Sequence, residues 1–325
     1  MEVSDQSRAF LINAVILLSV LSGLWAGNYV VDPYRANRMV DVVPNKQAIA
    51  SGVSHHEWLV ARYRHERADI VLIGDSRMNR FDEATLGELV DLPVMNLSAG
   101  GARWRELLAM ATYVLDEGHP KRIYLQLNVD HLNGSIRTDR ASQARDLLEH
   151  PLRYYFHPEI TRASATLLWH TLSKSSPASE APPMDADAFW RWQLESVARI
   201  SYANWTWPEQ ALRDLAQLSN RCEARGIALV VVMLPVHEDL RERFVDLGFR
   251  DTSQRLKRAI RGIAALVDFD RPSALTSDRS RFLDPYHLGG SYEDVAREMF
   301  GVAGNLADHT FPVTRPSAGS LAPPS

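Results

Sequence analysis

The stretch IVLIGDSRM at residues 70–78 decides the fold. Its first four residues are large, apolar and mostly β-branched, which is typical of a short strand buried on both faces. The run leads into Gly74, which permits a tight exit from a strand, and then into Asp75 and Ser76. Ligands of open α/β sheets bind beyond the carboxyl ends of the strands, so this pattern places Ser76 at the functional edge. The alternative is that Asp75 or Ser76 only caps the helix that follows.

Four further apolar runs rich in β-branched residues are predicted as strands. They lie at residues 94–97, 123–127, 227–234 and 266–269. Segments with helical periodicity separate them. These segments include residues 104–115, 210–225 and 253–265. Alternation of strands with helices predicts an α/β protein, a three-layer α/β/α sandwich whose mostly parallel, five-stranded sheet is covered on both faces.

The composition excludes several classes of protein. The 325 residues are 46% hydrophobic and 23% charged, as in a globular protein. The 36 basic and 40 acidic residues sum to −4, so we expect no nucleic-acid partner. A single cysteine, Cys222, excludes an intramolecular disulfide. The sequence holds no glycine-rich phosphate loop, so no cofactor is expected. No metal site is predicted either, because the adjacent residues His55, His56 and Glu57 diverge around a helix.

Residues 9–31 form an uncharged, apolar run, AFLINAVILLSVLSGLWAGNYVV. At about 1.5 Å per residue the run can cross a hydrocarbon core of about 30 Å, and it predicts a transmembrane anchor after a short tail at residues 1–8. A cleaved signal peptide is the alternative, but cleavage after Ala26 puts Leu24 where a small residue is wanted. Basic residues flank the run on both sides, so the charge count leaves its orientation open.

The anchor is followed by a predicted linker at residues 32–68 and then by the α/β domain at residues 69–306. The linker contains an amphipathic helix at residues 54–67. The side chains expected to face inward from this helix are Trp58, Leu59 and Tyr63. A tail at residues 307–325 has too few large apolar side chains to order and is predicted to be disordered.

The alternation of strands and helices stops at about residues 131–207, which predicts an insertion in the domain. Its first part is polar and rich in loop-forming residues. Five of the eight tryptophans lie in its second half, at positions 169, 190, 192, 205 and 207. These tryptophans form either a small helical core or an aromatic surface beside a site.

A second motif, FLDPYHLGG at residues 282–290, brings Asp284 and His287 close together in sequence. A serine hydroxyl is a poor nucleophile until a histidine removes its proton. That histidine needs an acceptor on its other nitrogen to fix its tautomer. Asp284 and His287 can supply both groups from one loop and activate Ser76. The alternative is a loop histidine and a loop aspartate with no relation to Ser76.

A third motif, NLSAGG at residues 96–101, again follows a predicted strand. Backbone N–H groups at such a turn can stabilise a developing oxyanion, although two glycines after a strand also make an ordinary turn. Asp75, Arg77 and Gly101 flank these groups and are the predicted substrate-binding residues. Arg77 is expected at the start of a helix, where it either binds a substrate carboxylate or is a solvated surface residue.

Together these motifs resemble the SGNH (GDSL-like) hydrolase superfamily of α/β/α serine hydrolases and acyltransferases. Gly-Asp-Ser at 74–76 matches the nucleophile block, the glycines at 100–101 the second block, and Asp-Pro-Tyr-His at 284–287 the closing block. The third block of the family, Gly-x-Asn-Asp, reads Gln-Leu-Asn-Val-Asp at 126–130.

The resemblance implies a role for each matching residue. Ser76 would be the nucleophile, His287 the general base and Asp284 the residue that orients it. The oxyanion hole would be formed by the backbone amides of Ser76 and Gly100 and by the side chain of Asn128.

An N-terminal span before one such domain is similar to the membrane-anchored members that accompany membrane-bound O-acyltransferases. That likeness implies a single-pass protein of the bacterial inner membrane, with its domain facing the periplasm or the cell exterior. Its partners would be an acylated cell-envelope polysaccharide and a membrane-bound O-acyltransferase. The leading hypothesis is therefore transfer of O-acetyl groups through an acyl-enzyme. The alternatives are a carbohydrate or lipid esterase and a catalytically silent polysaccharide-binding or assembly partner.

Overall fold

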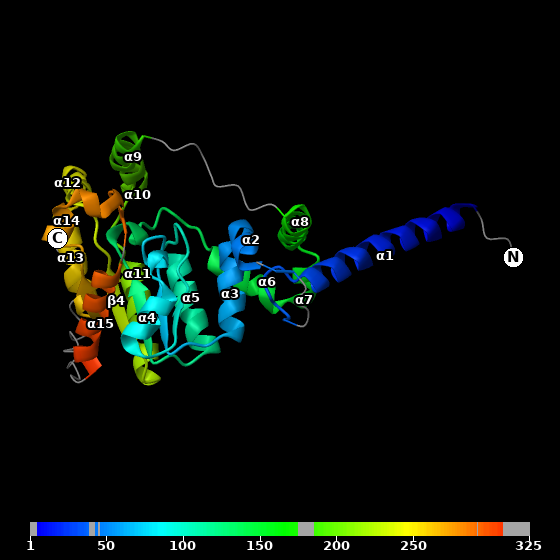
Figure 1. Ribbon diagram of the computed structural model, residues 1–325, viewed down its shortest axis with the longest axis horizontal. Coiled ribbons are helices and arrows are strands. Elements are labelled where there is room, and N and C mark those ends of the chain that lie inside the picture. The colour runs from blue at the N-terminus through cyan, green and yellow to red at the C-terminus, as the bar shows by residue number, and fades with distance from the viewer. Residues whose placement is uncertain (1–4, 39–42, 45, 175–184, 291, 308–325) are drawn as a thin grey trace. The chain divides into compact units, whose positions relative to one another are not determined.

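The structure is a computed structural model that describes residues 5–38, 43–44, 46–174, 185–290 and 292–307 (Figure 1). The chain divides into two compact units. Unit 1 comprises residues 1–66 and 140–181, and unit 2 comprises residues 67–139 and 182–325. The predicted insertion at 131–207 is therefore shared between the units. All of the predicted tail at 307–325 except residue 307 lies outside the described residues.

Unit 1 is helical. Its helices are α1 (Asp5–Val31), α2 (Lys46–Val53), α3 (His55–His65), α6 (Arg140–Glu149), α7 (Pro151–Tyr155) and α8 (Pro158–Ser173). Helix α3 packs against α6, and α2 packs against α8. The predicted inward face of α3 is confirmed, because Trp58, Leu59 and Tyr63 are all buried.

Helix α1 is long and apolar enough to cross a membrane, over Gln6–Val31, and a signal sequence passes the same test. The described residues of the predicted tail at 1–8, residues 5–8, are helical and belong to α1. The chain turns at the end of this helix because the Asp32 carboxylate accepts hydrogen bonds from the backbone amides of residues 36–38.

Unit 2 contains the predicted sheet. Its strands are β1 (Ile70–Ile73), β2 (Val94–Asn96), β3 (Arg122–Gln126), β4 (Ala228–Met233) and β5 (Ala265–Asp268). They are all parallel, in the order β2-β1-β3-β4-β5. A separate antiparallel pair consists of β6 (Phe282–Asp284) and β7 (His287–Leu288).

The helices of unit 2 connect these strands. The α-helices are α4 (Glu83–Val90), α5 (Trp104–Glu117), α9 (Ala186–Trp192), α10 (Ala198–Tyr202), α11 (Glu209–Ala224), α12 (Glu238–Asp246), α13 (Arg250–Arg261), α14 (Ala274–Ser277) and α15 (Glu293–Ala307). Short turns of other helical types are η1 (Met78–Arg80), η2 (Val129–Leu132), η3 (Gln193–Val197) and η4 (Arg279–Arg281). The helix predicted at 253–265 ends earlier than expected, because Gly262 caps α13 and β5 begins at Ala265.

Both faces of the sheet are covered, which confirms the three-layer α/β/α fold (Figure 1). Successive strand residues point to opposite faces. On one face Ile70 and Leu72 share a core with Leu86 of α4 and Met299 of α15. On the other face Val71 and its neighbours are buried, and α5, α11 and α13 pack against β3, β4 and β5. Parallel strands place all their carboxyl ends at one edge, so the polar segments after β1, β2 and β3 meet there.

Candidate active site

Ser76, His287 and Asp284 form a chain of hydrogen-bonding distances at the carboxyl edge of the sheet. The Oγ of Ser76 lies 2.7 Å from Nε2 of His287. On the other side of the imidazole, Nδ1 lies 2.8 Å from Oδ2 and 3.0 Å from Oδ1 of Asp284. The imidazole is partly exposed, whereas the carboxylate is buried. The structure therefore brings together three residues from the two ends of unit 2.

The β6–β7 hairpin holds the acid and the base in position. Asp284 pairs with His287 across this hairpin. Oδ1 of Asp284 also accepts hydrogen bonds from the backbone amides of Tyr286, at 2.8 Å, and His287, at 3.1 Å. The carbonyl of Pro285 accepts a hydrogen bond from the amide of His237, which precedes α12. Hydrogen bonds therefore hold the turn internally and also join it to the rest of unit 2.

This arrangement determines which imidazole nitrogen can act as a base. A carboxylate only accepts hydrogen bonds, so Nδ1 of His287 carries the proton that faces Asp284. Nε2 is then left with a lone pair, toward which the hydroxyl of Ser76 can donate. In this geometry His287 can take the serine proton while Asp284 stabilises the resulting imidazolium.

The turn that carries Ser76 is packed tightly against the residues around it. A Cβ on Gly74 would lie only 2.4 Å from Oε1 of Gln126 and 2.4 Å from the Cβ of Met78. That Oε1 also accepts a hydrogen bond from the amide of Asp75 at 3.0 Å. Asn96, at the end of β2, donates to the carbonyls of Met78 and Phe81. Neighbouring strands β3 and β2 therefore clamp the segment on either side of the serine.

Arg77 is buried, so the prediction that it lies at the surface is wrong. Its guanidinium contacts Asp75, with the shortest distance 2.6 Å, and Asp130, at 3.0 Å. Asp130 also pairs with Arg103 at 3.1 Å. The charged groups of Asp75 and Arg77 are thus engaged with each other beneath the serine turn. The predicted direct substrate contacts of these two residues are not supported.

Sequence reasoning did not assign the other members of this network. Asp130 and His131 lie in η2, just beyond the polar end of β3, and that position was their only signal. His131 is buried, and its Nδ1 accepts a hydrogen bond from the amide of Asn128 at 3.0 Å. Its Nε2 lies 2.9 Å from Oδ2 of Asp75 and 3.1 Å from Nη2 of Arg77. The imidazole of His131 therefore completes a cluster of two carboxylates and two guanidinium groups.

The charges of this network shift its pKa values in a consistent direction. Burial is the largest single effect and would raise the pKa of Asp75 and of Asp130, but Arg77 and the other neighbours of these carboxylates together outweigh it and hold both pKa values below their ordinary value. Burial opposes the charged form of Arg77 too, yet the two carboxylates raise its pKa well above the usual range. The cluster is therefore ionised at neutral pH.

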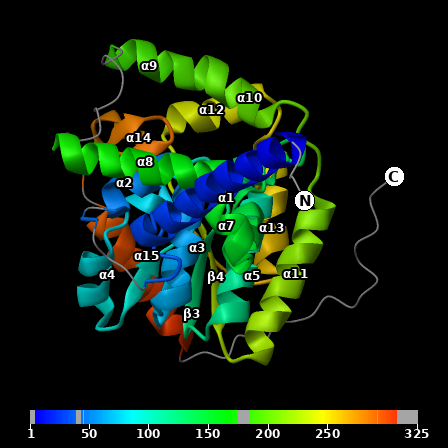
Figure 2. The ribbon, with the colours of Figure 1, turned by 90° about the vertical axis from the view of Figure 1, so that its right-hand side faces the viewer.

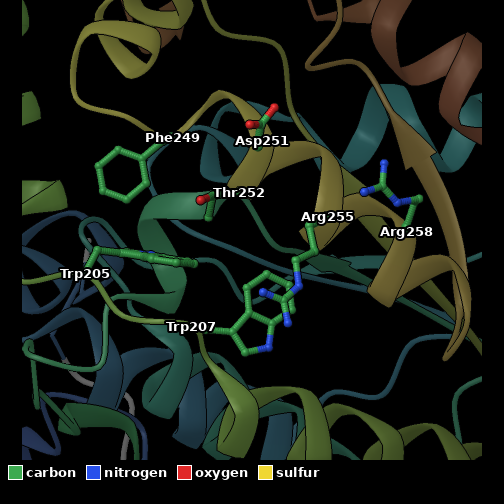
Figure 3. Close-up of a pocket in the computed structure, with 7 residues that line it drawn as sticks. All are labelled: Trp205, Trp207, Phe249, Asp251, Thr252, Arg255 and Arg258. Carbon is green, nitrogen blue, oxygen red and sulfur yellow. The ribbon is translucent and has the colours of Figure 1, made fainter. Parts of the chain in front are cut away.

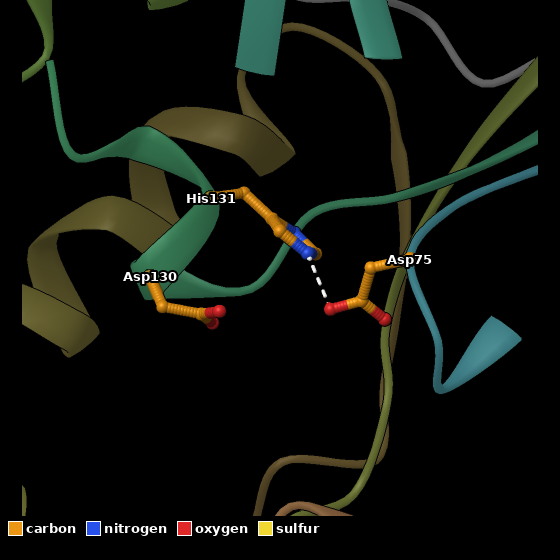
Figure 4. A group of neighbouring side chains, drawn as sticks. All are labelled: Asp75, Asp130 and His131. Carbon is orange, nitrogen blue, oxygen red and sulfur yellow. Dashed lines mark hydrogen bonds and ion pairs between the residues drawn. The ribbon is translucent and has the colours of Figure 1, made fainter. Parts of the chain in front are cut away.

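Asp75, Asp130 and His131 also lie close enough to one another to suggest a metal site, with one ligand atom from each within 4.8 Å (Figure 4). Their contacts do not fit a metal ion. The guanidinium of Arg77 lies between the two carboxylates and is also 3.1 Å from Nε2 of His131. A cation would have to displace this guanidinium. Arg77 already supplies the positive charge that this donor set needs.

The structure gives different positions to the predicted oxyanion groups. The side-chain amide of Asn128 donates to the carbonyl of Leu234 at 2.9 Å, so it ties the ends of β3 and β4 together. The prediction that this amide faces an oxyanion is therefore not supported. Gly100 and Gly101 lie exposed beyond β2, and a positive φ of 68° at Gly101 makes the turn. The backbone amides of Ser76 and Gly100 remain the predicted donors.

Three of the five tryptophans of the insertion lie in a core or in a pocket. Trp190 is buried and donates to Asp239 at 2.8 Å, as part of a core. Trp205 and Trp207, by contrast, line an open pocket of about 400 Å³ (Figure 3). Its other lining residues are Phe249, Asp251, Thr252, Arg255 and Arg258.

Two contacts characterise this aromatic pocket. The guanidinium of Arg255 lies 3.9 Å from the centre of the Trp207 ring. The indole N–H of Trp205 donates to the carbonyl of Val129, the residue before Asp130. The pocket is thus connected to the buried charge network at the same edge of the sheet.

Comparisons with known proteins give fold-level similarities only. No protein-family model matches the chain. No curated protein matches it either. Twelve chains of solved structures match. They include a "putative acylhydrolase" from Bacteroides fragilis NCTC 9343, with 9% identity, 74% of this chain and 88% of that chain covered, and a TM-score of 0.41. Another is a "putative platelet activating factor" from Streptococcus pneumonia, with 13% identity, coverages of 80% and 93%, and a TM-score of 0.42. At these values neither structure assigns a site or an activity to this chain.

Proposed function

We propose that this protein is a serine-dependent acyl enzyme that removes an acyl group from an O-acyl ester and carries it on Ser76. The observation that supports the proposal is the continuous arrangement from Ser76 through His287 to Asp284, with distances of 2.7 and 2.8 Å. This is the arrangement that makes a serine hydroxyl nucleophilic near neutral pH. In terms of general activity class, the proposed enzyme is an esterase.

The reaction would proceed in two balanced steps. Oγ of Ser76 bonds to the ester carbonyl carbon while its proton moves to Nε2 of His287. The bond to the leaving alkoxide then breaks, the alcohol departs with that proton, and the acyl group remains on Ser76. In the second step an incoming hydroxyl attacks the acyl carbon and gives its proton to His287, the bond between the acyl carbon and Oγ breaks, and His287 returns the proton to Oγ of Ser76. With water the product is a carboxylic acid, and with a sugar hydroxyl it is a new ester.

The finer proposal is that the acyl group is acetyl and the acceptor is a cell-envelope polysaccharide. The aromatic pocket supports this choice, because Trp205 and Trp207 offer flat apolar rings of the kind on which sugar rings stack. Arg255 and Arg258 add positive charge, which favours an acidic sugar. Helix α1 supports a location at a membrane, where a membrane-bound O-acyltransferase would be the partner that supplies acyl groups.

A non-catalytic binding protein is the second candidate. The position of Asn128 favours it, because the side-chain donor that the family resemblance implies for the oxyanion is bonded to Leu234. A protein of this kind would keep the aromatic pocket and bind polysaccharide without turnover. The two candidates differ in whether Ser76 reacts with an electrophile.

A two-part experiment on the full-length protein in detergent tests these proposals. Wild type and Ser76→Ala are first treated with a fluorophosphonate, which labels only an activated serine. Label on the wild type alone supports the acyl enzyme. An unlabelled, folded wild type rejects it and leaves the binding protein. In the second part, wild-type enzyme that has not been treated with the fluorophosphonate is given p-nitrophenyl acetate with neutral or acidic oligosaccharides. Acetylated sugar supports transfer, whereas acetate alone with every acceptor restricts the function to ester hydrolysis.

A further inference from the structure

The C-terminal end of α1 is built into unit 1. Asn28 is buried, and its side-chain amide donates to the carbonyl of Tyr155 at 2.7 Å and to the hydroxyl of Thr161 at 2.9 Å. Trp25 stacks on Tyr29 with 5.1 Å between ring centres, and both rings contact Tyr155. Helices α7 and α8 thus lie beside the end of the apolar helix (Figures 1 and 2). Cleavage after Ala26 would cut the chain within this packed turn.

Helices α7 and α8 expose large apolar side chains next to that contact. Leu152 of α7 is 73% exposed, and Phe156 directly after α7 is also exposed. On α8, Trp169 is 68% exposed and Leu172 is 81% exposed, and Leu168 lies beside them. Large apolar patches of this kind are uncommon on soluble surfaces and mark sites of interaction. We name these five side chains the α7–α8 patch.

The spacing of residues on α8 separates three faces. Ile160, Ala163, Ser164 and Leu167 are buried in unit 1. Leu168, Trp169 and Leu172 lie on a neighbouring stripe, because residues three and four apart share a face. Glu159 lies on the side of the helix away from Leu172, and Arg162, two turns before Trp169, pairs with it at 2.6 Å. Packing within unit 1 therefore does not account for the exposed stripe.

We propose that the α7–α8 patch lies in the interfacial region of the lipid bilayer that α1 crosses. The bilayer is the expected contact of this patch because α7 and α8 pack on the end of α1. The apolar side chains of α1 are themselves exposed along most of that helix. Leucine, phenylalanine and tryptophan are also the side chains that amphipathic helices insert at this depth. Unit 1 would then rest on the membrane through a second contact besides α1.

The charges beside the patch indicate that apolar insertion, rather than attraction to anionic lipids, makes this contact. Arg162 is neutralised by Glu159, and Arg153 of α7 pairs with Asp146. The basic side chains nearest the patch therefore have carboxylate partners on their own unit. We expect the contact to persist at high salt and on uncharged phosphatidylcholine.

Site-directed fluorescence on the full-length protein in phosphatidylcholine vesicles tests the proposal. Trp169→Cys and Leu172→Cys each place a thiol on the patch, and Glu159→Cys places one about 140° around the same helix from Leu172 as a matched control. The natural Cys222 gives little background because it is buried, which raises the pKa of its thiol to about 11. Each variant is labelled with an environment-sensitive nitrobenzoxadiazole dye, and its fold is checked by circular dichroism.

If the patch is interfacial, dyes at 169 and 172 emit at shorter wavelength than the dye at 159 and are quenched by doxyl-labelled lipids. Quenching should remain at about 1 M salt, where the Debye length falls to about 3 Å. Equal emission and no quenching at all three positions would overturn the proposal. Protection of 169 and 172 in native membranes but not in vesicles would also overturn it, because a membrane-protein partner would then cover the patch.

Discussion

The side-chain carbonyl of Gln126 lies 3.0 Å from the backbone nitrogen of Asp75 and accepts its hydrogen bond. This contact joins the end of β3 to the turn that carries Ser76. It also explains the glycine at position 74, because Gln126 occupies the space where a Cβ would project. The orientation of the nucleophile therefore depends on a neighbouring strand.

Gly74→Ala should weaken both the fold and the site. The new methyl group would lie 2.4 Å from Gln126 and from Met78, and overpacking of this kind typically costs about 1–3 kcal/mol. We expect a lower urea midpoint and slower ester turnover, measured by tryptophan fluorescence and by p-nitrophenyl acetate hydrolysis. Gly134→Ala is the matched control, because no atom lies within 4 Å of its added Cβ. Equal midpoints for the two variants would show that the tight turn is not required.

Ser76→Ala and His287→Ala should each lower kcat by about 10⁶-fold, because the first change removes the nucleophile and the second removes its base. Asp284→Asn should cost less, up to about 10⁴-fold at most. An asparagine keeps one oxygen for the amides of Tyr286 and His287 but can turn an NH₂ group toward Nδ1, which favours the wrong tautomer. Steady-state kinetics with an acetyl ester measures all three. Wild-type activity in folded His287→Ala would refute the assigned base.

Arg77→Met should destabilise unit 2 strongly, because it leaves Asp75 and Asp130 buried without their shared counter-charge. Breaking a buried ion pair in this way costs about 3–5 kcal/mol. Arg213→Met is the comparison, since the pair of Arg213 with Glu209 is solvent-exposed and such pairs contribute about 0–1 kcal/mol. Urea unfolding curves for the two variants give the difference. Similar stabilities would mean that the network contributes little to the fold.

The same network predicts how stability depends on pH. The pKa values of Asp75 and Asp130 lie below their ordinary value in the folded protein, because Arg77 and the other neighbours of these carboxylates together outweigh the effect of burial. The unfolded chain, with aspartate pKa values near 3.9, therefore binds more protons than the folded chain below about pH 4. The stabilisation that these two carboxylates provide is present above that pH. It is lost as the pH falls through their pKa values in the folded protein. Asp130→Asn should flatten the fall in melting temperature between about pH 5 and pH 3. An unchanged slope would exclude Asp130 as a source of acid sensitivity.

Trp207→Ala should reduce acyl transfer to oligosaccharides while leaving hydrolysis of a small ester unchanged. The indole of Trp207 lines the aromatic pocket and lies under the guanidinium of Arg255, but it contacts no member of the triad in the described residues. Trp192→Ala removes a half-exposed tryptophan outside the pocket and serves as the control. The ratio of acetylated sugar to free acetate is the measurement. Equal ratios in both variants would remove the pocket from acceptor binding.

Local sequence was sufficient to predict the framework of unit 2. Each predicted strand differs from the observed one by at most one residue at either end. Short β-branched runs bounded by turn residues specify buried strands through local sterics and burial, without any long-range information. The pairing of Ser76 with Asp284 and His287 was also a sequence prediction, because parallel topology brings strand ends to one edge. The structure places these three residues within hydrogen-bonding distance.

Tertiary structure alone decided the contacts that depend on the depth and direction of individual side chains. Arg77 was expected at the surface but pairs with Asp130, 53 positions away, because both fall beneath the serine turn. Asn128 bonds to Leu234, 106 positions away. Of the tryptophans of the insertion, Trp190 is buried in a core, whereas Trp205 and Trp207 line a pocket. Residues 140–174 belong to unit 1 with α1. Sequence periodicity records which face of an element is apolar. It does not record which distant element covers that face, because only three-dimensional packing of the whole chain selects the partner.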